Sequence, residues 1–284
     1  MRQESETDIV LITGCSSGIG HALALALHRQ GCKVLATARK LEALADLAAE
    51  GMEVCALDVT VEDSRQALLR HVQTHHWQVD TLINNAGYGA MGPLLDMDES
   101  AWQAQFAVNL FAPMQLARLL APMMVRRGRG RIVNISSVSG ILTTPFAGAY
   151  CASKAAFTAA SDALRMELAA FGVRVITVQP GAIRSAFGGN AQAAIRLAPD
   201  SLYQGIKAAV LARAGASQEG ATPAEVFAQE LSRHLLAPSC PPILRLGNKS
   251  RIMPWMKALL PTARLDKMLR QRFQLDRLRF VQPE

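Results

Sequence analysis

Two side chains one helical turn apart could carry out acid–base chemistry in this chain. Tyr150 and Lys154 stand four residues apart at the start of a helical pattern, so they share one helix face. A phenol titrates near pH ~10 and is a poor acid or base at neutral pH unless a nearby cation stabilises the phenolate. Lys154 could be that cation, and Ser137, in a turn after an apolar run, could hold a substrate oxygen. Taken alone, a Tyr and a Lys at this spacing are more often ordinary surface residues.

A glycine-rich turn lies between the first apolar run and the first helical pattern. Its sequence is Thr13-Gly14-Cys15-Ser16-Ser17-Gly18-Ile19-Gly20. Glycines permit positive φ and let backbone N–H groups approach an anion, and the positive end of the following helix would attract a pyrophosphate. The spacing differs from the general G-x-G-x-x-G fingerprint, so a purely structural turn remains the alternative.

The end of the second apolar run predicts which dinucleotide would bind. An acid at this position would hydrogen-bond the adenosine ribose of NAD, but Ala38 occupies it and Arg39 follows. A guanidinium can hold the 2′-phosphate of NADP in a bidentate way, whereas an acid would repel it. We therefore predict NADP(H) over NAD(H); an Arg39 that is simply solvated beside Lys40 is the alternative.

These residues need a scaffold, and apolar runs that alternate with helical patterns predict one. The candidate strands are residues 8–14, 33–38, 54–57, 81–84, 131–136, 174–179 and 243–247, and the candidate helices are 21–31, 42–50, 62–75, 99–127, 150–171 and 223–236. Continuous apolar strands fit a parallel sheet that is buried on both faces. Right-handed crossovers then give a doubly wound α/β sheet, that is, a Rossmann fold, here with seven strands.

Two stretches fall outside this alternation. Residues 186–222 are rich in Ala and Gly and long enough to form a substrate lid. Residues 248–284 form a basic tail. We expect one catalytic domain over residues 1–247, which includes the lid, and a C-terminal amphipathic extension over 248–284.

The net charge of +7 is concentrated in this tail. Residues 248–284 hold nine Lys/Arg and three Asp/Glu, whereas the other residues hold 21 and 20. A nearly neutral body argues against nucleic-acid binding. Half of the 284 residues are apolar, which is enough for a large core, yet no run reaches ~18 uninterrupted apolar residues. With a short acidic start instead of a signal peptide, we expect a cytoplasmic protein.

Cysteines and histidines show no metal-ligand spacing. The five cysteines, Cys15, Cys32, Cys55, Cys151 and Cys240, are scattered and predict reduced thiols. His75 and His76 are adjacent and therefore point apart on a helix. We predict no metal site.

Apolar side chains recur at helical spacing in the tail. Ile252, Met256, Leu259 and Leu260 precede Pro261, and Leu265, Met268, Leu269 and Phe273 follow it. Basic residues fill the other face: Lys257, Arg264, Lys267, Arg270, Arg272, Arg277 and Arg279. Such helices could lie on an anionic membrane surface, or could pack on the body or on a second subunit. Packing is the favoured alternative.

Over roughly residues 8–247 the chain resembles the short-chain dehydrogenase/reductase family. Thr13–Gly20 matches the family's T-G-x-x-x-G-x-G, Asn84-Asn85-Ala86-Gly87 matches its N-N-A-G, and Tyr150 with Lys154 matches its Y-x-x-x-K. Ser137 lies thirteen residues before Tyr150, which is the family's spacing. Pro180-Gly181-Ala182-Ile183-Arg184-Ser185 matches a P-G motif followed by a hydroxyl residue, and Asp58-Val59 ends the third strand where family members touch the adenine.

The resemblance implies four catalytic residues. Tyr150 would be the general acid for ketone reduction, Lys154 would lower its pKa and bind the nicotinamide ribose, and Ser137 would orient the carbonyl. Asn109 matches the residue that holds a water on the proton relay. Pro113 supports this role, because proline has no N–H to donate to the Asn109 carbonyl four residues earlier. An ordinary proline kink is the alternative.

The resemblance also implies a cofactor-binding set. Its members are Gly14, Ser16, Ser17, Gly18, Ile19, Gly20, Arg39, Asp58, Val59, Asn85, Ala86, Gly87, Tyr150, Lys154, Pro180, Gly181, Ile183 and Ser185. Among these, Ile183 and Ser185 would contact the nicotinamide carboxamide, and residues 85–87 would pass the adenosine side.

We therefore expect an NADP(H)-dependent oxidoreductase that acts on lipophilic ketones, aldehydes or secondary alcohols. The tail and the lid resemble those of the subgroup active on steroids, retinoids or acyl-dihydroxyacetone phosphate. The alternatives are a reductase of a polar substrate such as a 3-oxoacyl thioester, and a non-catalytic NADP-sensing protein. The resemblance further implies a homodimer or homotetramer joined through helices near residues 99–127 and 150–171.

Overall fold

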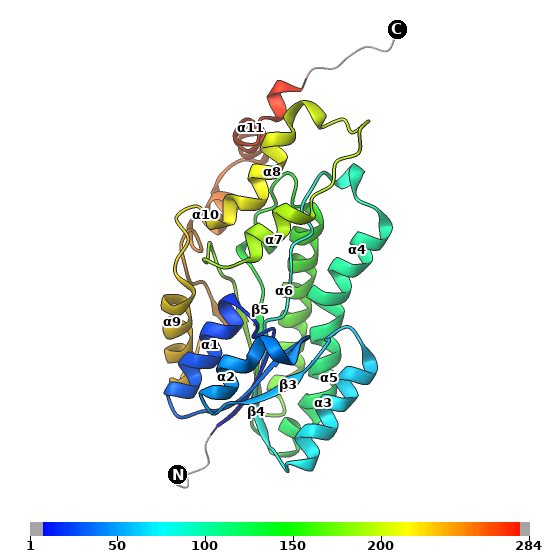
Figure 1. Ribbon diagram of the computed structural model, residues 1–284. Coiled ribbons are helices and arrows are strands. Elements are labelled where there is room, and N and C mark those ends of the chain that lie inside the picture. Colours follow the sequence, from blue (N-terminus) through cyan, green and yellow to red (C-terminus); the bar gives the residue numbers. More distant parts are fainter. Residues whose placement is uncertain (1–7, 279–284) are drawn as a thin grey trace.

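Seven parallel strands form one sheet at the centre of the structure, a computed structural model that describes residues 8–278 (Figure 1). The strand order is β3-β2-β1-β4-β5-β6-β7, and every pairing is parallel. The strands are β1 (Ile9–Thr13), β2 (Lys33–Ala38), β3 (Glu53–Ala56), β4 (Val79–Asn84), β5 (Gly130–Ile135), β6 (Val173–Val178) and β7 (Ile243–Leu244). The predicted doubly wound α/β fold with seven strands is confirmed.

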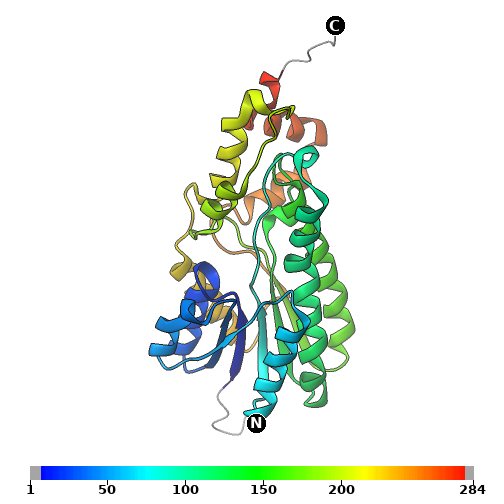
Figure 2. The same cartoon turned by 45° about the vertical axis from the view of Figure 1, so that its right-hand side comes forward.

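Helices cover both faces of the sheet and exclude water from it (Figures 1 and 2). On one face lie α1 (Gly18–Arg29), α2 (Ala45–Ala49) and α9 (Ala224–Leu236). On the other face lie α3 (Glu62–Thr74), α5 (Ala112–Arg126) and α6 (Gly148–Ala169), with α4 (Glu99–Phe106) leading into α5. The strands can therefore be continuously apolar, as the sequence pattern predicts.

Helix α5 shows how residue spacing produces this packing. Leu116, Leu120 and Met124 recur every four residues, so they lie on one face of the helix. That face is buried in the apolar core against the sheet. The helical stretch Glu99–Arg126, to which α5 belongs, is by length and composition the one candidate membrane span among residues 8–278. A buried core helix satisfies the same criteria.

Most predicted bounds shift by one to three residues, and three elements differ more. The helix expected over 42–50 is a 3-10 turn, Leu41–Leu44, followed by the short α2. The helix expected over 99–127 is interrupted by a π-helical turn, Ala107–Phe111, and the strand expected over 243–247 is only the two-residue β7. The remaining 3-10 segments are Leu94–Asp96, Val138–Gly140, Gln204–Ile206, Ala216–Gln218 and Leu275–Arg277.

The parallel strands all end at the same edge of the sheet, and the strand order reverses between β1 and β4. In open α/β sheets a ligand-binding crevice forms outside the carboxyl ends of the strands at such a reversal. The glycine-rich turn follows β1 and the N-N-A-G motif follows β4. The fold therefore brings these two motifs to the edges of one crevice.

Four helices lie above this edge of the sheet, and we call them the cap (Figures 1 and 2). The cap consists of α7 (Phe187–Ala194) and α8 (Lys207–Gly215) from the predicted lid, and α10 (Ile252–Leu259) and α11 (Thr262–Arg272) from the tail. Lid and tail share one apolar cluster that also includes Tyr150. The two stretches that stand outside the strand–helix alternation thus form one structural unit above the crevice.

The tail packs on the body along its second helix. Leu265, Leu269 and Phe273 are buried against the lid, which confirms the favoured alternative for this part of the tail. The first predicted apolar stripe behaves differently: Ile252 is 61% exposed and Leu259 is 70% exposed. The stripe is therefore divided, because its other two members, Met256 and Leu260, pack partly buried against the same cluster. Arg279 lies outside the described residues.

Candidate active site

The glycine-rich turn has the backbone geometry that an anion site requires. Gly14 and Gly18 have φ values of +74° and +60°, which strongly favour glycine. A Cβ on Gly14 would lie 2.9 Å from the Cα of Ala86, so the turn passes directly against the segment after β4. Helix α1 begins at Gly18 with no capping hydrogen bond from Ser17 and no acidic side chain in its first turn. Its positive end is therefore open to a phosphate.

Asn85 fixes this turn from the neighbouring strand. Its Nδ2 donates to the carbonyls of Thr13 and Gly14 at 2.9 and 3.0 Å. In return, the Thr13 hydroxyl accepts the N–H groups of Asn85 and Ala86, both at 3.0 Å. Asn85 therefore holds the glycine turn in place, and Thr13 is a second residue that does so; Thr13 was not among the predicted site residues. Cys15 is buried within the turn, and burial raises the pKa of its thiol to about 12, so it acts as packing.

Tyr150 and Ser137 meet at the start of α6. Both side chains are buried, and Ser137 also accepts the N–H of Ser139 at 3.0 Å. Burial raises the pKa of Tyr150 to about 12, while its hydrogen bond with Ser137 and the positive charge of Arg213 act in the opposite direction. The phenol is therefore protonated at neutral pH and ready to donate.

Lys154 lies one turn further along α6 and is also buried. Its Nζ donates to the carbonyl of Ile135, the last residue of β5, at 2.8 Å. Burial lowers the pKa of this amine to about 8. A Cβ on Gly87 would lie 3.2 Å from the Asn109 Oδ1 and 3.6 Å from the Lys154 Nζ, so the N-N-A-G segment passes close to both side chains. The expected stabilisation of the Tyr150 phenolate by Lys154 stays a prediction.

Asn109 sits in the π-helical turn between α4 and α5. The N–H of Ala112 donates to the carbonyl of Ala107, five residues back, and Pro113 follows without an N–H. The predicted irregularity around Asn109 is confirmed. Its side chain is buried and fixed, because Nδ2 donates to the Tyr88 carbonyl and to the Ser153 hydroxyl, both at 3.0 Å. Ser153 is a supporting residue that sequence reasoning did not identify.

The residues predicted for the adenosine side follow β2 and β3. Arg39 is exposed directly after Ala38, the last residue of β2. Asp58 accepts the Thr60 backbone N–H at 2.9 Å and the Thr60 hydroxyl at 2.6 Å. These hydrogen bonds, together with the charges of Arg39 and Arg65, lower the pKa of the Asp58 carboxyl. The structure thus places Arg39 close to Asp58, and Val59 beside it is buried.

The P-G motif after β6 reaches the other side of the crevice. A Cβ on Gly18 would lie 3.0 Å from the Cβ of Ser185, so the glycine turn and this motif approach each other. Gln218, from the lid, accepts the Ser185 N–H at 3.0 Å and donates to the Ile183 carbonyl at 3.3 Å. Gln218 is a further supporting residue that the motifs do not reveal, because it lies 33 residues beyond Ser185.

Apolar side chains surround Tyr150 on the cap side. The Tyr150 and Phe187 rings lie 5.4 Å apart between centroids. Met91, Phe146 and Phe273 belong to the same buried cluster. The hydroxyl and amine groups of Ser137, Tyr150 and Lys154 thus form the polar floor of the site on the sheet side, and the apolar side chains of the cap form its roof.

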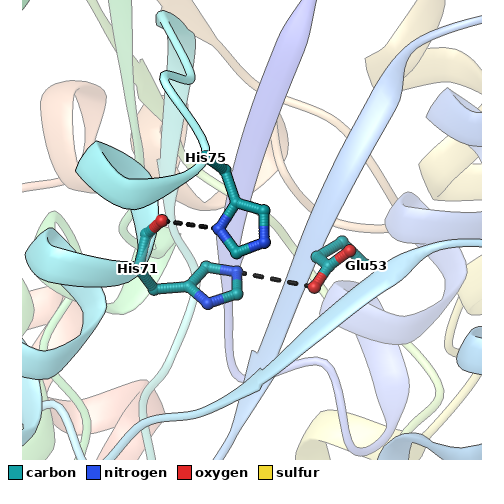
Figure 3. Close-up of side chains that lie close together, drawn as sticks. All are labelled: Glu53, His71 and His75. Carbon is teal, nitrogen blue, oxygen red and sulfur yellow. Dashed lines mark hydrogen bonds and ion pairs between the residues drawn. The ribbon is translucent and has the colours of Figure 1, made fainter.

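A separate group of polar side chains lies at the β3 edge of the sheet (Figure 3). His71 Nε2 is 3.5 Å from a carboxylate oxygen of Glu53, and His75 Nδ1 is 2.8 Å from the His71 carbonyl oxygen. The ring of Trp77 contacts both histidines, and the Lys33 ammonium lies 4.1 Å from that ring. The adjacent pair His75 and His76 was the one noted in the sequence, whereas His71 and His75, four residues apart on one helix face, are the pair that comes together. The expectation of no metal site stays a prediction.

Comparison with known proteins places this geometry in a family. A family model described as short chain dehydrogenase matches residues 8–195. The short-chain dehydrogenase ptmH of Penicillium ochrochloron is 38% identical over 260 residues, which cover 90% of this chain and 94% of that protein. An NADPH-dependent 1-acyldihydroxyacetone phosphate reductase of Schizosaccharomyces pombe is 39% identical over 178 residues, which cover 62% of this chain and 60% of that protein.

Solved structures show the same architecture. A short-chain dehydrogenase from Streptomyces avermitilis aligns with a TM-score of 0.77 at 30% identity, over 96% of this chain and 97% of that one. A metagenomic short-chain oxidoreductase in complex with NADP aligns with a TM-score of 0.58 at 38% identity, over 62% of this chain and 83% of that one. A 4-hydroxyisoleucine dehydrogenase complexed with NADH and succinate aligns with a TM-score of 0.60 at 31% identity, over 63% of this chain and 78% of that one. Dinucleotides with the 2′-phosphate (NADP) and without it (NADH) therefore both occur among its structural relatives.

Lys154 should make the stability of the fold depend on pH. Its pKa is about 8 in the folded chain against an ordinary value of 10.5, so between these pH values the unfolded chain binds a proton that the folded chain does not. Stability therefore rises with pH in this window. In urea denaturation, the free energy of unfolding of the wild type minus that of Lys154→Met should rise by about 1–3 kcal/mol from pH 8 to 10.5.

The matched control is Lys207→Met, which removes an exposed lysine from α8. The difference in the free energy of unfolding between this variant and the wild type should stay constant over the same pH range. An equally constant difference for Lys154→Met would contradict the depressed pKa of the buried amine.

Proposed function

This chain belongs to the short-chain dehydrogenase/reductase family, and we propose that it transfers a hydride between NADP(H) and lipophilic ketones, aldehydes or secondary alcohols with Tyr150 as the general acid and base. Family membership makes it an oxidoreductase of carbonyl and alcohol groups. The finer proposal rests on one observation: Tyr150, Ser137 and Lys154 lie buried together at the carboxyl edge of the sheet, beneath an apolar cap.

The residues of the crevice fit a dinucleotide. The open start of α1 would hold the pyrophosphate, Arg39 the 2′-phosphate, and Lys154 the nicotinamide ribose. Ile183 and Ser185 would face the carboxamide, since the glycine turn and Ser185 already approach each other. When bound in its reduced form, the nicotinamide supplies a hydride, with its electron pair, to the carbonyl carbon.

The protein's own part in the reaction is proton transfer and orientation. The Ser137 hydroxyl would hold the carbonyl oxygen, and Tyr150 would donate its proton to that oxygen as the π bond opens, so that an alcohol forms. A phenol with a pKa of about 12 is protonated at neutral pH, which suits donation to a ketone. The phenolate would then be held by Lys154 and reprotonated from solvent through a water at Asn109.

The apolar roof supports a lipophilic substrate. Met91, Phe146 and Phe187 line the side of Tyr150 that faces the cap. The relative from Schizosaccharomyces pombe is named for an acylated substrate, which is consistent with such a roof. Steady-state rates on ketones of graded polarity would separate this proposal from a polar 3-oxoacyl thioester substrate. NADPH binding without turnover on any of them would indicate a cofactor-sensing protein instead.

We further propose that the chain self-associates through α5 and α6. A hollow on this face is lined almost entirely by apolar side chains: Met114, Ala117, Arg118, Ala121, Pro122, Val125, Leu164 and Leu168. Phe111 and Phe171, near the ends of the same two helices, are exposed. A contiguous apolar face of this kind is typical of an interface, here with a second copy of the chain.

The exposed side of α10 supports peripheral contact with an anionic membrane surface. Ile252, Trp255 and Leu259 are all exposed on this helix, and the tail around them is strongly basic. Apolar insertion combined with attraction to anionic lipid is the pattern of an interfacial helix. We place the protein in the cytoplasm, at a membrane surface when this helix is engaged.

Replacing Tyr150 tests the proposed acid. Tyr150→Phe removes the proton donor but keeps the ring that packs on Phe187. NADPH consumption with a ketone should fall by about 10²-fold or more, because general acid catalysis is lost. NADPH binding, followed by fluorescence, should persist. Tyr203→Phe, which changes another tyrosine in the same way, should retain activity; near-normal turnover of Tyr150→Phe would exclude Tyr150 as the acid.

Reversing the charge at position 39 tests the cofactor preference. Arg39→Asp should lower the ratio of kcat/KM for NADPH over NADH by about 10–100-fold, because it removes a charged hydrogen bond and repels the 2′-phosphate. Lys40→Asp is the matched control and should leave the ratio within about threefold. An unchanged NADPH affinity in Arg39→Asp would place Arg39 outside the site.

Membrane contact is tested by co-sedimentation with vesicles. The double variant Ile252→Ser/Leu259→Ser should lose binding to vesicles that contain anionic phospholipid, since about 2–4 kcal/mol of apolar insertion is removed. Leu95→Ser/Leu202→Ser changes two equally exposed leucines outside the tail and should bind like the wild type. If the wild type fails to sediment with anionic vesicles, the membrane proposal is wrong.

A further inference from the structure

Arg213 is a buried cation in the cap. It lies on α8 with only 8% of its surface exposed, and its helix neighbours Val210 and Ala214 belong to the apolar cluster that contains Phe146 and Tyr150. A guanidinium stays charged in proteins, and burying a charge costs several kcal/mol unless a partner compensates for it. A buried arginine therefore normally pairs with a carboxylate.

The partners that the structure gives Arg213 are all uncharged. The Thr144 hydroxyl accepts from Nε at 3.0 Å and from Nη2 at 2.6 Å, and the guanidinium lies 5.6 Å from the Phe273 ring. Among residues 8–278, no carboxylate forms an ion pair with Arg213, and its Nη1 forms no hydrogen bond but is not among the fully buried unpaired atoms, so it is accessible from outside. One edge of the guanidinium is thus fixed by Thr144, while the remaining nitrogen is left without an acceptor.

Arg213 lies close enough to Tyr150 for its charge to act on the phenol. Its charge acts on the Tyr150 hydroxyl and on the thiol of Cys151, the next residue. Thr144, which holds Arg213, belongs to the segment that connects Ser137 to Tyr150. Arg272 adds a second positive charge nearby, although it is more exposed and pairs with Glu219 at 3.1 Å. A ligand that reaches Tyr150 therefore meets apolar walls and a positive potential.

We propose that Arg213 binds an anionic group of the substrate, a carboxylate or a phosphate, so that the site selects carbonyl compounds that combine an apolar chain with an acidic head. This inference rests on the proposed function of the same site and narrows its substrate class. The planar guanidinium suits both anions, because each can accept charge-assisted hydrogen bonds from Nη1 and Nη2. Binding would supply the missing counter-charge of Arg213.

Matched substrate pairs test the inference. The first pair is a medium-chain oxo-carboxylic acid and its methyl ester, and the second is a long-chain ketone with a phosphate monoester and its free alcohol. With NADPH, the wild type should prefer the anionic member of at least one pair by about 10–100-fold in kcat/KM, which is the usual effect of a hydrogen bond to a charged group. The pair that shows the preference identifies carboxylate or phosphate as the acidic head.

Variants assign this preference to Arg213. Arg213→Gln should bring the anionic-to-neutral ratio close to one, mainly through KM for the anionic member, and Arg213→Lys should restore part of it. Lys207→Gln, which removes an exposed charge from the same helix, should leave the ratio unchanged. If Arg213 served only to tune Tyr150, Arg213→Gln would lower kcat for both members equally and leave the ratio intact, which would overturn the inference.

The kcat/KM values of the wild type for the two substrate pairs are enough to test the inference, so the test does not depend on the folding of a variant. Equal kcat/KM values within both pairs would overturn the inference, while the proposed function would stand because the ketones are reduced. If no ketone is reduced, the proposed function fails. Anion binding is then measured as the increase in the unfolding temperature of the protein when a ligand is added. In that experiment decanoate or decyl phosphate should stabilise the wild type more than decanol does, and equal stabilisation would overturn the inference.

Discussion

The burial of the Lys154 ammonium is the constraint on which the site depends. Its Nζ is held by the carbonyl of Ile135, so the amine ties the start of α6 to the end of β5. Because Ser137 follows β5 and Tyr150 lies in the first turn of α6, this hydrogen bond, together with those of Asn134 with Ser161 and of Ser136 with the Lys154 carbonyl, helps to set where the two hydroxyl groups meet. Desolvating an amine destabilises the fold at neutral pH, and the depressed pKa measures that cost. A site that keeps such a residue uses it for something other than stability.

Side-chain hydrogen bonds between segments far apart in the sequence fix the geometry of the site. Asn85 and Thr13 exchange hydrogen bonds across β1 and β4, which fixes the glycine turn. Ser153 orients the Asn109 amide, and Gln218 links the lid to Ser185. Each of these contacts joins segments at least 33 residues apart, so the order of the parallel strands determines the site. Side chains held in this way are pre-organised, and little reorganisation is needed when ligands bind.

The sequence predicted the sheet, the main helices and the candidate catalytic residues, because these depend on local spacing. Apolar runs and the i, i+4 pair Tyr150 and Lys154 are visible without tertiary structure, and Pro113 predicted the irregular helix at Asn109. Contacts of Arg213 and Gln218 were not predictable, because each depends on where the cap helices dock. For the same reason the first apolar stripe of the tail stayed open between packing and a membrane surface: helical periodicity identifies an apolar face but not what covers it.

Two buried cations lie near Tyr150, Lys154 on the same helix and Arg213 in the cap. Lys154 lies on the polar floor of the crevice, whereas Arg213 lies in the apolar roof and lowers the pKa of Tyr150 through its charge. An anion bound to Arg213 would cancel that positive field at the Tyr150 hydroxyl. The phenol would then hold its proton more firmly, since burial raises its pKa and the opposing charge is gone. Because the pKa of Tyr150 is already about 12, the phenol starts each turnover protonated with or without this anion. Arg213 would therefore contribute to substrate binding and not to the charge state of the acid.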